Sequence, residues 1–248
     1  KPMNGPVSDD PFYFDDLTYT NVFEYLSNIA SEHAEEALSL ATKTIDRVVS
    51  LGGDNKEDEV FKFYDKFLLL EADFFDLELD QKKHLSYRDD VRELAATIVI
   101  LGKRLIGEKC HESKFVKDIY TKYIQYLPDS RSIWRLRLFI LSLCPEAFKD
   151  ELKEAFWRPL NSERYYEFVS GAEYQRSLQK GFSVLSENDK REYIKKVIEY
   201  FGERIKNDPE DARRHKTYGS RIVSVIANDF TPEEKKKAEK YLEFIPNY

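Results

Sequence analysis

The sequence predicts an all-α protein, an irregular HEAT-like α-solenoid built from antiparallel helical hairpins. Apolar residues recur at the helical period along most of the chain, and no segment shows the two-residue alternation of a half-buried strand. No proline occurs between Pro11 and Pro128, and the later prolines stand near expected helix boundaries. The breaks between helices are short, which favours antiparallel neighbours, and so many hairpins in a row tend to stack.

The first five expected helices follow from apolar stripes and from the breaks that separate them. Gly52 and Gly53 open one strong break, and Pro128 lies in the other. The helix with the clearest stripe covers 113–127. In chain order these helices cover 17–30, 33–50, 57–79, 88–107 and 113–127, and the clearest stripe is Phe115, Val116, Ile119, Tyr120, Tyr123, Ile124 and Leu127.

The remaining seven helices are marked by apolar stripes and by N-terminal capping signals. The helix 131–143 is apolar on nearly every side, so we expect it to be the most buried. Thr231 and Glu234 predict a capping box around Pro232, and Asp208 repeats that logic as an acidic N-cap. These helices cover 131–143, 146–157, 162–170, 173–185, 188–206, 210–228 and 232–244.

Two parts of the chain differ in composition. Residues 1–11 are rich in proline, glycine and aspartate and predict a flexible lead-in. Residues 12–248 predict a single α-solenoid domain. Because the chain begins with Lys1 rather than methionine, we expect it to be a fragment of a larger protein.

Composition and charge limit the classes of function that the chain can have. The net charge of −7 gives no general attraction to nucleic acid or to an anionic membrane. No apolar run approaches the roughly 20 residues that span a bilayer. Cys110 and Cys144 lie far apart without a Cys-x-x-Cys motif, which predicts reduced thiols and a cytoplasmic protein.

The sequence contains no assembled catalytic or metal-binding motif. A single Glu-x-x-His occurs, from Glu108 to His111, whereas a di-iron bundle needs two such motifs and two further glutamates. Phosphate-binding glycine loops and nucleophile-elbow motifs are absent. We therefore expect no catalytic residue, no metal ligand and no cofactor. A helical hydrolase or nuclease with scattered carboxylates is the alternative.

Two basic groups are the candidate partner-binding residues. One surrounds Trp134 on the helix 131–143, and the other lies on the helix 210–228 and continues onto the last helix. Trp and Arg are favoured at protein interfaces, although a basic run also simply solvates a helix face. The acidic and aromatic segment 71–80 is a second candidate. The expected partner-binding residues are Arg131, Trp134, Arg135, Arg213, Arg214, Lys216, Arg221 and Lys236.

Several stretches carry a resemblance to a known family. Residues 173–191, 134–141 and the helix that contains 213–215 resemble the C-terminal α-solenoid arrays of large prokaryotic NTPases of the STAND type. The opening residues 23–26 and 34–38 are similar as well. The resemblance implies a sensor or assembly arm whose ATPase and effector lie elsewhere, and it carries over no catalytic residue.

The sequence thus predicts a non-catalytic protein-interaction or sensor module, a scaffold within a larger protein. Its partner would be another protein or the remainder of the parent chain, and not a membrane. A nucleic-acid-binding helical array is the less favoured alternative, because it needs the basic groups to share one concave face.

Overall fold

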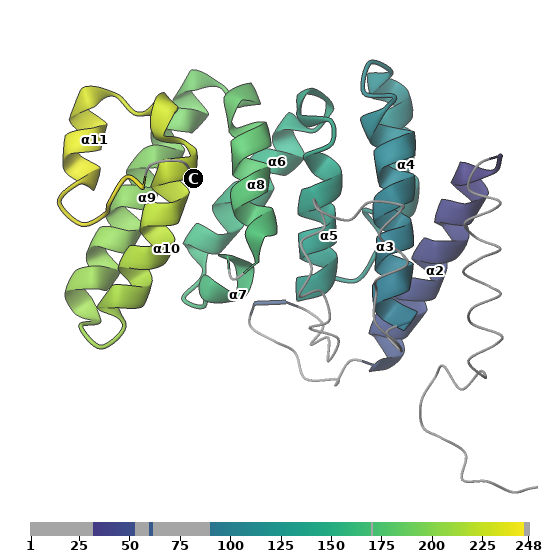
Figure 1. The fold of residues 1–248 in the computed structure, drawn as a ribbon, viewed down its shortest axis with the longest axis horizontal. Helices are drawn as coiled ribbons and strands as arrows, with labels where there is room; N and C mark the ends of the chain where they lie inside the picture. The colour runs from purple at the N-terminus through teal and green to yellow at the C-terminus, as the bar shows by residue number, and fades with distance from the viewer. Residues whose placement is uncertain (1–31, 53–59, 62–89, 170, 246–248) are drawn as a thin grey trace, which may run out of the picture. The chain divides into compact units, whose positions relative to one another are not determined.

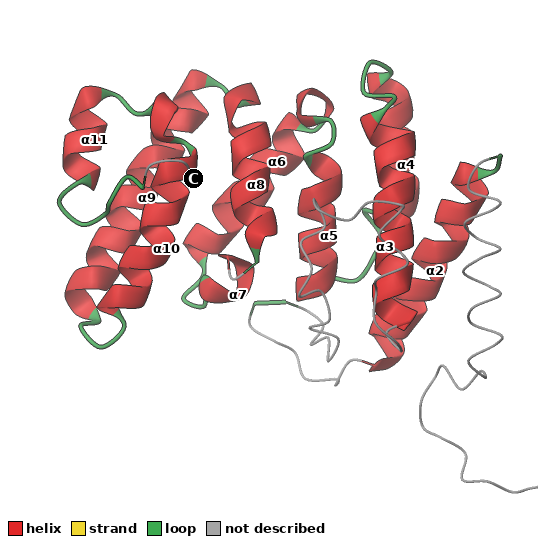
Figure 2. Cartoon of the chain, in the orientation of Figure 1, coloured by secondary structure: helices red, strands yellow, loops and turns green. Residues whose placement is uncertain are grey.

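The computed structural model describes residues 32–52, 60–61, 90–169 and 171–245, in two compact units, Lys1–Arg137 and Leu138–Tyr248. All regular secondary structure in these described stretches is helical, and they contain no β-strand (Figure 2). The all-α prediction is therefore confirmed for this part of the chain. Of the described helices, none is long and apolar enough to cross a membrane. The expected helix 17–30, nearly all of 57–79, and the lead-in lie outside the described residues.

The N-terminal unit contains α2 (Ala34–Gly52), α3 (Asp90–Gly102), a π-helical turn (Lys103–Gly107) and α4 (Ser113–Tyr123). Helices α2 and α3 pack against each other, and α2 also contacts α4. Helix α2 buries an apolar stripe at Ala37, Leu38, Ala41, Ile45 and Val48, and Ala34 at its start is half-buried.

Helix α3 is more completely buried than expected. Every residue from 94 to 102 is buried, whereas α5 (Arg131–Leu141) keeps four residues partly accessible. The expectation that the helix 131–143 is the most buried is thus wrong. The reason is visible in the sequence of α3, because Leu94 to Leu101 contains only Thr97 as a polar residue.

The C-terminal unit continues after α5 with the α-helices α6 to α11 (Figure 1). Helices α9 and α10 lie side by side, α8 packs on α10, and α11 packs on α9. Its elements are a 3₁₀ turn (Pro145–Ala147), α6 (Lys149–Trp157), a 3₁₀ turn (Arg158–Asn161), α7 (Tyr166–Val169), α8 (Ala172–Gly181), a 3₁₀ turn (Phe182–Val184), α9 (Glu187–Asn207), α10 (Ala212–Val225), a 3₁₀ turn (Ala227–Asp229) and α11 (Pro232–Ala238).

An aromatic core holds α6, α8 and α9 together. The hydroxyl of Tyr174 donates to the carbonyl oxygen of Phe156 at 2.7 Å and lies 2.8 Å from the hydroxyl of Tyr193. Because the single proton of Tyr174 is used on Phe156, Tyr193 donates to Tyr174. Burial raises the pKa of both tyrosines, so both hydroxyls stay protonated donors at neutral pH.

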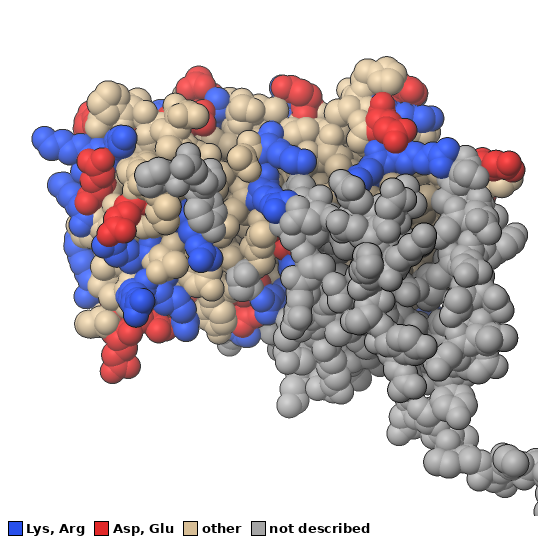
Figure 3. Space-filling model, in the orientation of Figure 1, with Lys and Arg blue, Asp and Glu red and all other residues tan. Residues whose placement is uncertain are grey.

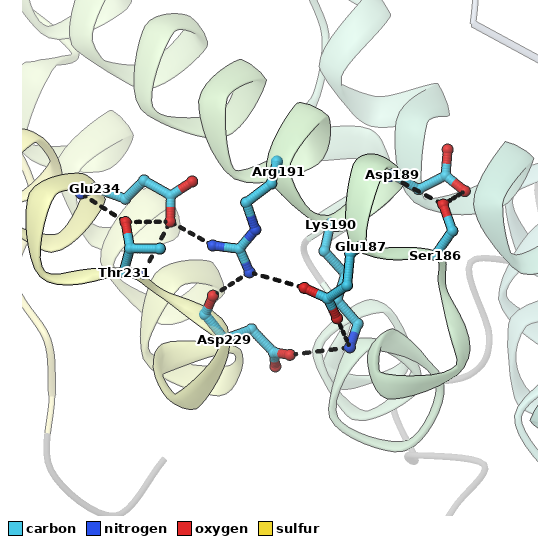
Figure 4. A network of polar contacts seen from close by, with 8 residues as sticks. All are labelled: Ser186, Glu187, Asp189, Lys190, Arg191, Asp229, Thr231 and Glu234. Atoms are coloured by element: carbon cyan, nitrogen blue, oxygen red, sulfur yellow. Dashed lines mark hydrogen bonds and ion pairs between the residues drawn. The ribbon is translucent and has the colours of Figure 1, made fainter.

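A polar network ties the start of α9 to the start of α11 (Figure 4). Arg191 contacts the carboxylate of Glu234 at 2.5 Å and donates to the carbonyl of Asp229. Lys190 contacts the Asp229 carboxylate at 3.3 Å. The predicted capping box is confirmed, since Thr231 accepts from the Glu234 amide and the Glu234 side chain accepts from the Thr231 amide.

Three predicted helices have boundaries that differ from the observed ones. Asp208 is not an N-cap, because α10 begins at Ala212 and the Asp208 carboxylate instead accepts from the Asp211 amide within the preceding turn. Helix α11 ends at Ala238, six residues before the expected end at 244, and the chain then turns back onto α9 and α10. The expected helix 162–170 contracts to α7 because Ser162 accepts from the Arg164 amide in a turn.

The cysteines are not reduced thiols. Cys110 and Cys144 are both disulfide-bonded, and neither is free. The prediction of reduced cysteines is therefore wrong. Spacing along the sequence was its only basis, and spacing does not report the oxidation state of a cysteine.

Candidate functional site

Helix α10 presents a basic face, which we define as Arg213, Arg214, Lys216 and Arg221. The helix carries these four basic side chains and no acidic one. Its apolar side is buried through Ile222 and Val223, so the basic residues at the start of the helix point outward. Arg213, Arg214 and Lys216 are exposed, as the sequence predicts, and Arg221 is half-buried.

The basic residues of this face differ in their partners. Arg214 pairs with Asp211 at 3.0 Å and lies over the ring of Tyr166. Lys216 pairs with Glu243 at 2.5 Å. Arg213 makes no ion pair with any residue that the structure describes. Its exposed guanidinium is thus available to pair with a carboxylate of a partner.

Lys236 lies on a different helix, α11, where it is exposed. Its neighbour Lys237 pairs with Glu233 at 2.7 Å, and Lys235 lies over the ring of Phe244. Figure 3 shows Lys and Arg side chains over the end formed by α9, α10 and α11, with Asp and Glu between them. The local charge there is mixed rather than uniformly positive.

The predicted group on α5 is a packing cluster rather than an exposed patch. Trp134 is only 3% exposed and lies against the ring of Phe61. Arg131 and Arg135 are half-buried. In the described conformation burial removes Trp134 from any accessible surface, so it is not placed as the interface anchor that we expected. Its burial depends on Phe61, which is distant in the sequence.

A buried hydrogen-bonded chain runs beneath the basic face. His215, which lies between Arg214 and Lys216 in the sequence, is 3% exposed. Its Nε2 lies 3.1 Å from Oδ2 of Asp208, and its Nδ1 lies 2.8 Å from the hydroxyl of Tyr165. An ionised carboxylate only accepts, so Nε2 donates to Asp208. In the tautomer with its proton on Nε2, Nδ1 accepts from the Tyr165 hydroxyl.

The charge states around this chain agree with that assignment. The hydrogen bond from His215 lowers the pKa of Asp208, which keeps the carboxylate ionised at neutral pH. Burial raises the pKa of Tyr165 to about 12, which keeps its hydroxyl a donor. Asp208 and Tyr165 together hold the imidazole in one orientation and so attach α10 to the turn before it and to Tyr165.

The order carboxylate, imidazole, hydroxyl is also that of a proton relay. Tyr165, however, is 1% exposed, so no substrate reaches its hydroxyl in this conformation. Within the described stretches, no three His, Cys, Asp or Glu side chains are grouped as metal ligands would be. The geometry of these residues supports a structural role. The sequence did contain a signal for the burial of His215, because it shares a helical face with Ile222 and Ile226.

A second polar cluster lies in the N-terminal unit, where the sequence gave no reason to expect it. Oε1 of Glu35 accepts from Nζ of Lys122 at 2.8 Å and from the hydroxyl of Tyr123 at 2.7 Å. The hydrogen bond from Lys122 lowers the pKa of Glu35. These groups line a shallow hollow beside Leu40, which is 47% exposed. Every polar group named here already has a partner, so the cluster joins α2 to α4.

The chain's own residues 241–245, which we call the C-terminal strap, cover one side of α10. The amide of Glu243 donates to Oγ of Ser220 at 2.8 Å, and the amide of Ile245 donates to Oγ of Ser224 at 2.7 Å. Lys216 is held by this strap through Glu243. Part of the basic face is therefore occupied by an acidic residue of the same chain.

The candidate site is thus a surface on α10, supported from below by His215 and partly covered by the strap. Comparisons of the chain with protein-family models, with curated proteins and with solved structures return no match.

Proposed function

We propose that this chain is a non-catalytic interaction module whose C-terminal unit binds an acidic segment of a protein partner through the basic face of α10. The observation that carries the proposal is the exposed triplet Arg213, Arg214 and Lys216 on a helix without acidic residues. The other side of that helix is fixed by His215 and Ile222, so the cations are displayed on a rigid support.

The charge distribution favours a protein segment over nucleic acid. A phosphate backbone requires a long stripe of unopposed cations. Around α10 the cations alternate with Asp211 and Glu243, which already pair with two of them. A short acidic segment with spaced carboxylates matches such a surface better, because electrostatic complementarity sets specificity and association rate.

We further propose that the helices stack as a HEAT-like array within a larger protein. The side-by-side helices α9 and α10 support this, because helix pairs of that kind are the units of such arrays. The resemblance to STAND-type arrays would make the chain a sensor or assembly arm. A cytoplasmic location would fit that family, but the disulfide-bonded cysteines favour an oxidising compartment.

The test uses a short fluorescein-labelled peptide rich in Glu and Phe, titrated with the whole chain and followed by fluorescence anisotropy. The double variant Arg213→Glu with Arg214→Glu should bind at least about tenfold more weakly, equivalent to about 1.4 kcal/mol. Raising the salt concentration should weaken the binding of the unchanged protein, because exposed charges are screened beyond about 10 Å at 0.1 M.

A matched control reverses two exposed lysines of α4, Lys114→Glu with Lys117→Glu, which make no ion pair among the described residues. This variant changes the net charge equally and should leave binding of the peptide nearly unchanged. Equal losses in the two variants, or no binding at all, would contradict the proposal. Tighter binding of single-stranded DNA than of the peptide would favour the nucleic-acid alternative instead.

A further inference from the structure

One side of α10 carries an evenly spaced set of polar side chains that hold the strap. Lys216, Ser220 and Ser224 recur every four residues and therefore lie on one side of the helix, which we call the α10 stripe. Ser224 donates its own proton to the carbonyl of Ser220 at 2.6 Å. Its oxygen thus stays free to accept from the amide of Ile245.

The spacing of the α10 stripe matches that of an extended peptide. Four residues of an α-helix rise about 6.0 Å, and two residues of an extended chain span about 6.6 Å. Alternate amides of an extended segment therefore meet successive serines, as the amides of Glu243 and Ile245 do. The serines bond to backbone amides, which every peptide except at proline supplies, so peptides of many sequences could bind. Lys216 adds a preference for an acidic residue.

The strap is anchored at its beginning by two glycines. A Cβ at Gly219 would lie 2.6 Å from Cδ2 of Leu242, and a Cβ at Gly202 would lie 3.0 Å from the ring of Tyr241. The missing side chains on α9 and α10 make the room that these two strap residues fill. Leu242 is accordingly only 2% exposed.

Beyond Leu242 the strap is held by two hydrogen bonds to the serines and by side chains that are largely exposed. The side chains of Lys216 and Glu243 are 46% and 68% exposed, and ion pairs at such exposure contribute little to stability. Ile245 is 40% exposed. Phe244 adds an edge-on contact with Phe230. The outer part, 243–245, can thus leave α10 while Leu242 stays in place.

We infer that the α10 stripe is a docking site for an extended peptide, and that residues 243–245 are its built-in, displaceable occupant. The occupant shows the chemistry that a partner must offer: an extended segment with an acidic residue followed by an aromatic and an aliphatic one. This inference rests on the proposed function and specifies it, because the acidic partner segment would replace Glu243 on Lys216. The strap then acts as an autoinhibitory cover.

The test opens the strap without removing its anchor. In the variant Glu243→Lys the strap is repelled by Lys216, whereas Leu242 is untouched. A labelled peptide with the sequence of residues 241–248 is then titrated against the whole chain. The opened variant should bind it at least about fivefold more tightly than the unchanged protein, because apparent affinity scales with the fraction of uncovered sites. The milder variant Glu243→Gln should give a smaller gain, and circular dichroism verifies that both stay folded.

The serines provide the second arm of the test. In the Glu243→Lys variant, the further changes Ser220→Ala and Ser224→Ala should weaken binding of the same peptide at least about tenfold, since both acceptors for its amides are lost. The matched control is Thr217→Ala on the same helix, whose hydroxyl donates to the carbonyl of Arg213 and has no other partner among the described residues. Hydrogen exchange should also be faster for the amides of Glu243 and Ile245 when the peptide is added to the unchanged protein.

The outcomes separate this inference from the proposed function. Suppose that opening the strap and removing the serines leave peptide affinity unchanged, while Arg213→Glu with Arg214→Glu still weakens the Glu- and Phe-rich peptide. The docking inference is then overturned, whereas the proposal that the basic face binds an acidic segment is supported. If none of these variants changes binding, both proposals fail. A dimer of the opened variant, seen by light scattering without any peptide, would identify a second copy as the occupant and overturn the partner segment.

Discussion

Nε2 of His215 donates to the carboxylate of Asp208 across 3.1 Å, although the histidine is buried in α10 and the aspartate lies in the turn before that helix. The turn is itself held by Asp208, which accepts from the Asp211 amide. One carboxylate thus fixes both the turn and the helix that displays the basic face. Its protonation should therefore loosen both.

The stability of the protein should fall in acid partly because of Asp208. Its pKa is lowered in the folded state, first by the hydrogen bond from His215, so the folded state favours the ionised form. Such a group stabilises above its unfolded pKa of about 3.9 and loses that contribution as the pH falls through the lower folded value. Urea titrations should show that Asp208→Asn is less stable than the unchanged protein at neutral pH, with the difference shrinking in that acid range. Asp118→Asn, at an exposed position of α4, is the control. If Asp208→Asn lowers the free energy of unfolding equally at neutral and at acid pH, the ionised Asp208 carboxylate is not the source of the effect.

Removing the hydroxyl of Tyr165 should destabilise the C-terminal unit. Tyr165→Phe keeps the ring but leaves Nδ1 of His215 buried without its donor. An unsatisfied buried acceptor typically costs about 1–3 kcal/mol, so we expect a loss of that size in the free energy of unfolding. The control is Tyr218→Phe, because the Tyr218 ring packs against Tyr165 but its hydroxyl makes no hydrogen bond to a described residue. Equal losses in both variants would show that ring packing, and not the hydrogen bond, is being measured.

The helices of the described part were predictable because local patterns determine them. The stripe of α4 and the capping box at Thr231 depend on residues within a few positions of each other, and both are observed. Local patterns do not show which residue, distant in the sequence, a given side chain contacts. Trp134 was predicted as an interface residue, but its ring packs against Phe61, and His215, between two exposed cations, is bonded to the distant Tyr165.

The candidate site was predictable only in part for the same reason. The exposed cations Arg213 and Arg214 follow from the helical period. The strap does not follow, because Ala238, Tyr241 and Leu242 also fit a helical stripe, so the sequence pattern is compatible with the predicted helix to 244. Only the space left by distant glycines on α9 and α10 favours the turn after Ala238.

Both cysteines should be unreactive until the protein is reduced. Iodoacetamide added to the denatured but unreduced chain should add no mass, because Cys110 and Cys144 are disulfide-bonded. After reduction it should modify both cysteines, the only two in the sequence. Intact-mass spectrometry measures this directly. Modification without reduction would contradict the disulfide and restore the expectation of a reducing cytoplasm.

Gly219→Ala should destabilise the protein even though alanine is the better helix former. In an exposed helix this change would stabilise by about 1 kcal/mol. Here the new Cβ would lie 2.6 Å from Cδ2 of Leu242 and 2.8 Å from Cγ of Phe201, which forces the strap or the α9 ring to move. Overpacking of this kind typically costs about 1–3 kcal/mol, so we expect a net loss of stability in urea.

Gly202→Ala is the matched comparison, because its Cβ would meet the rotatable ring of Tyr241 at 3.0 Å, and it should cost less. Leu242→Ala should be destabilising alone, yet should remove the part of the Gly219→Ala penalty that comes from Leu242, while the close contact with the Phe201 ring remains. Additive losses in that double-mutant cycle would mean that Gly219 and Leu242 do not compete for the same space, and the anchoring of the strap would need another explanation.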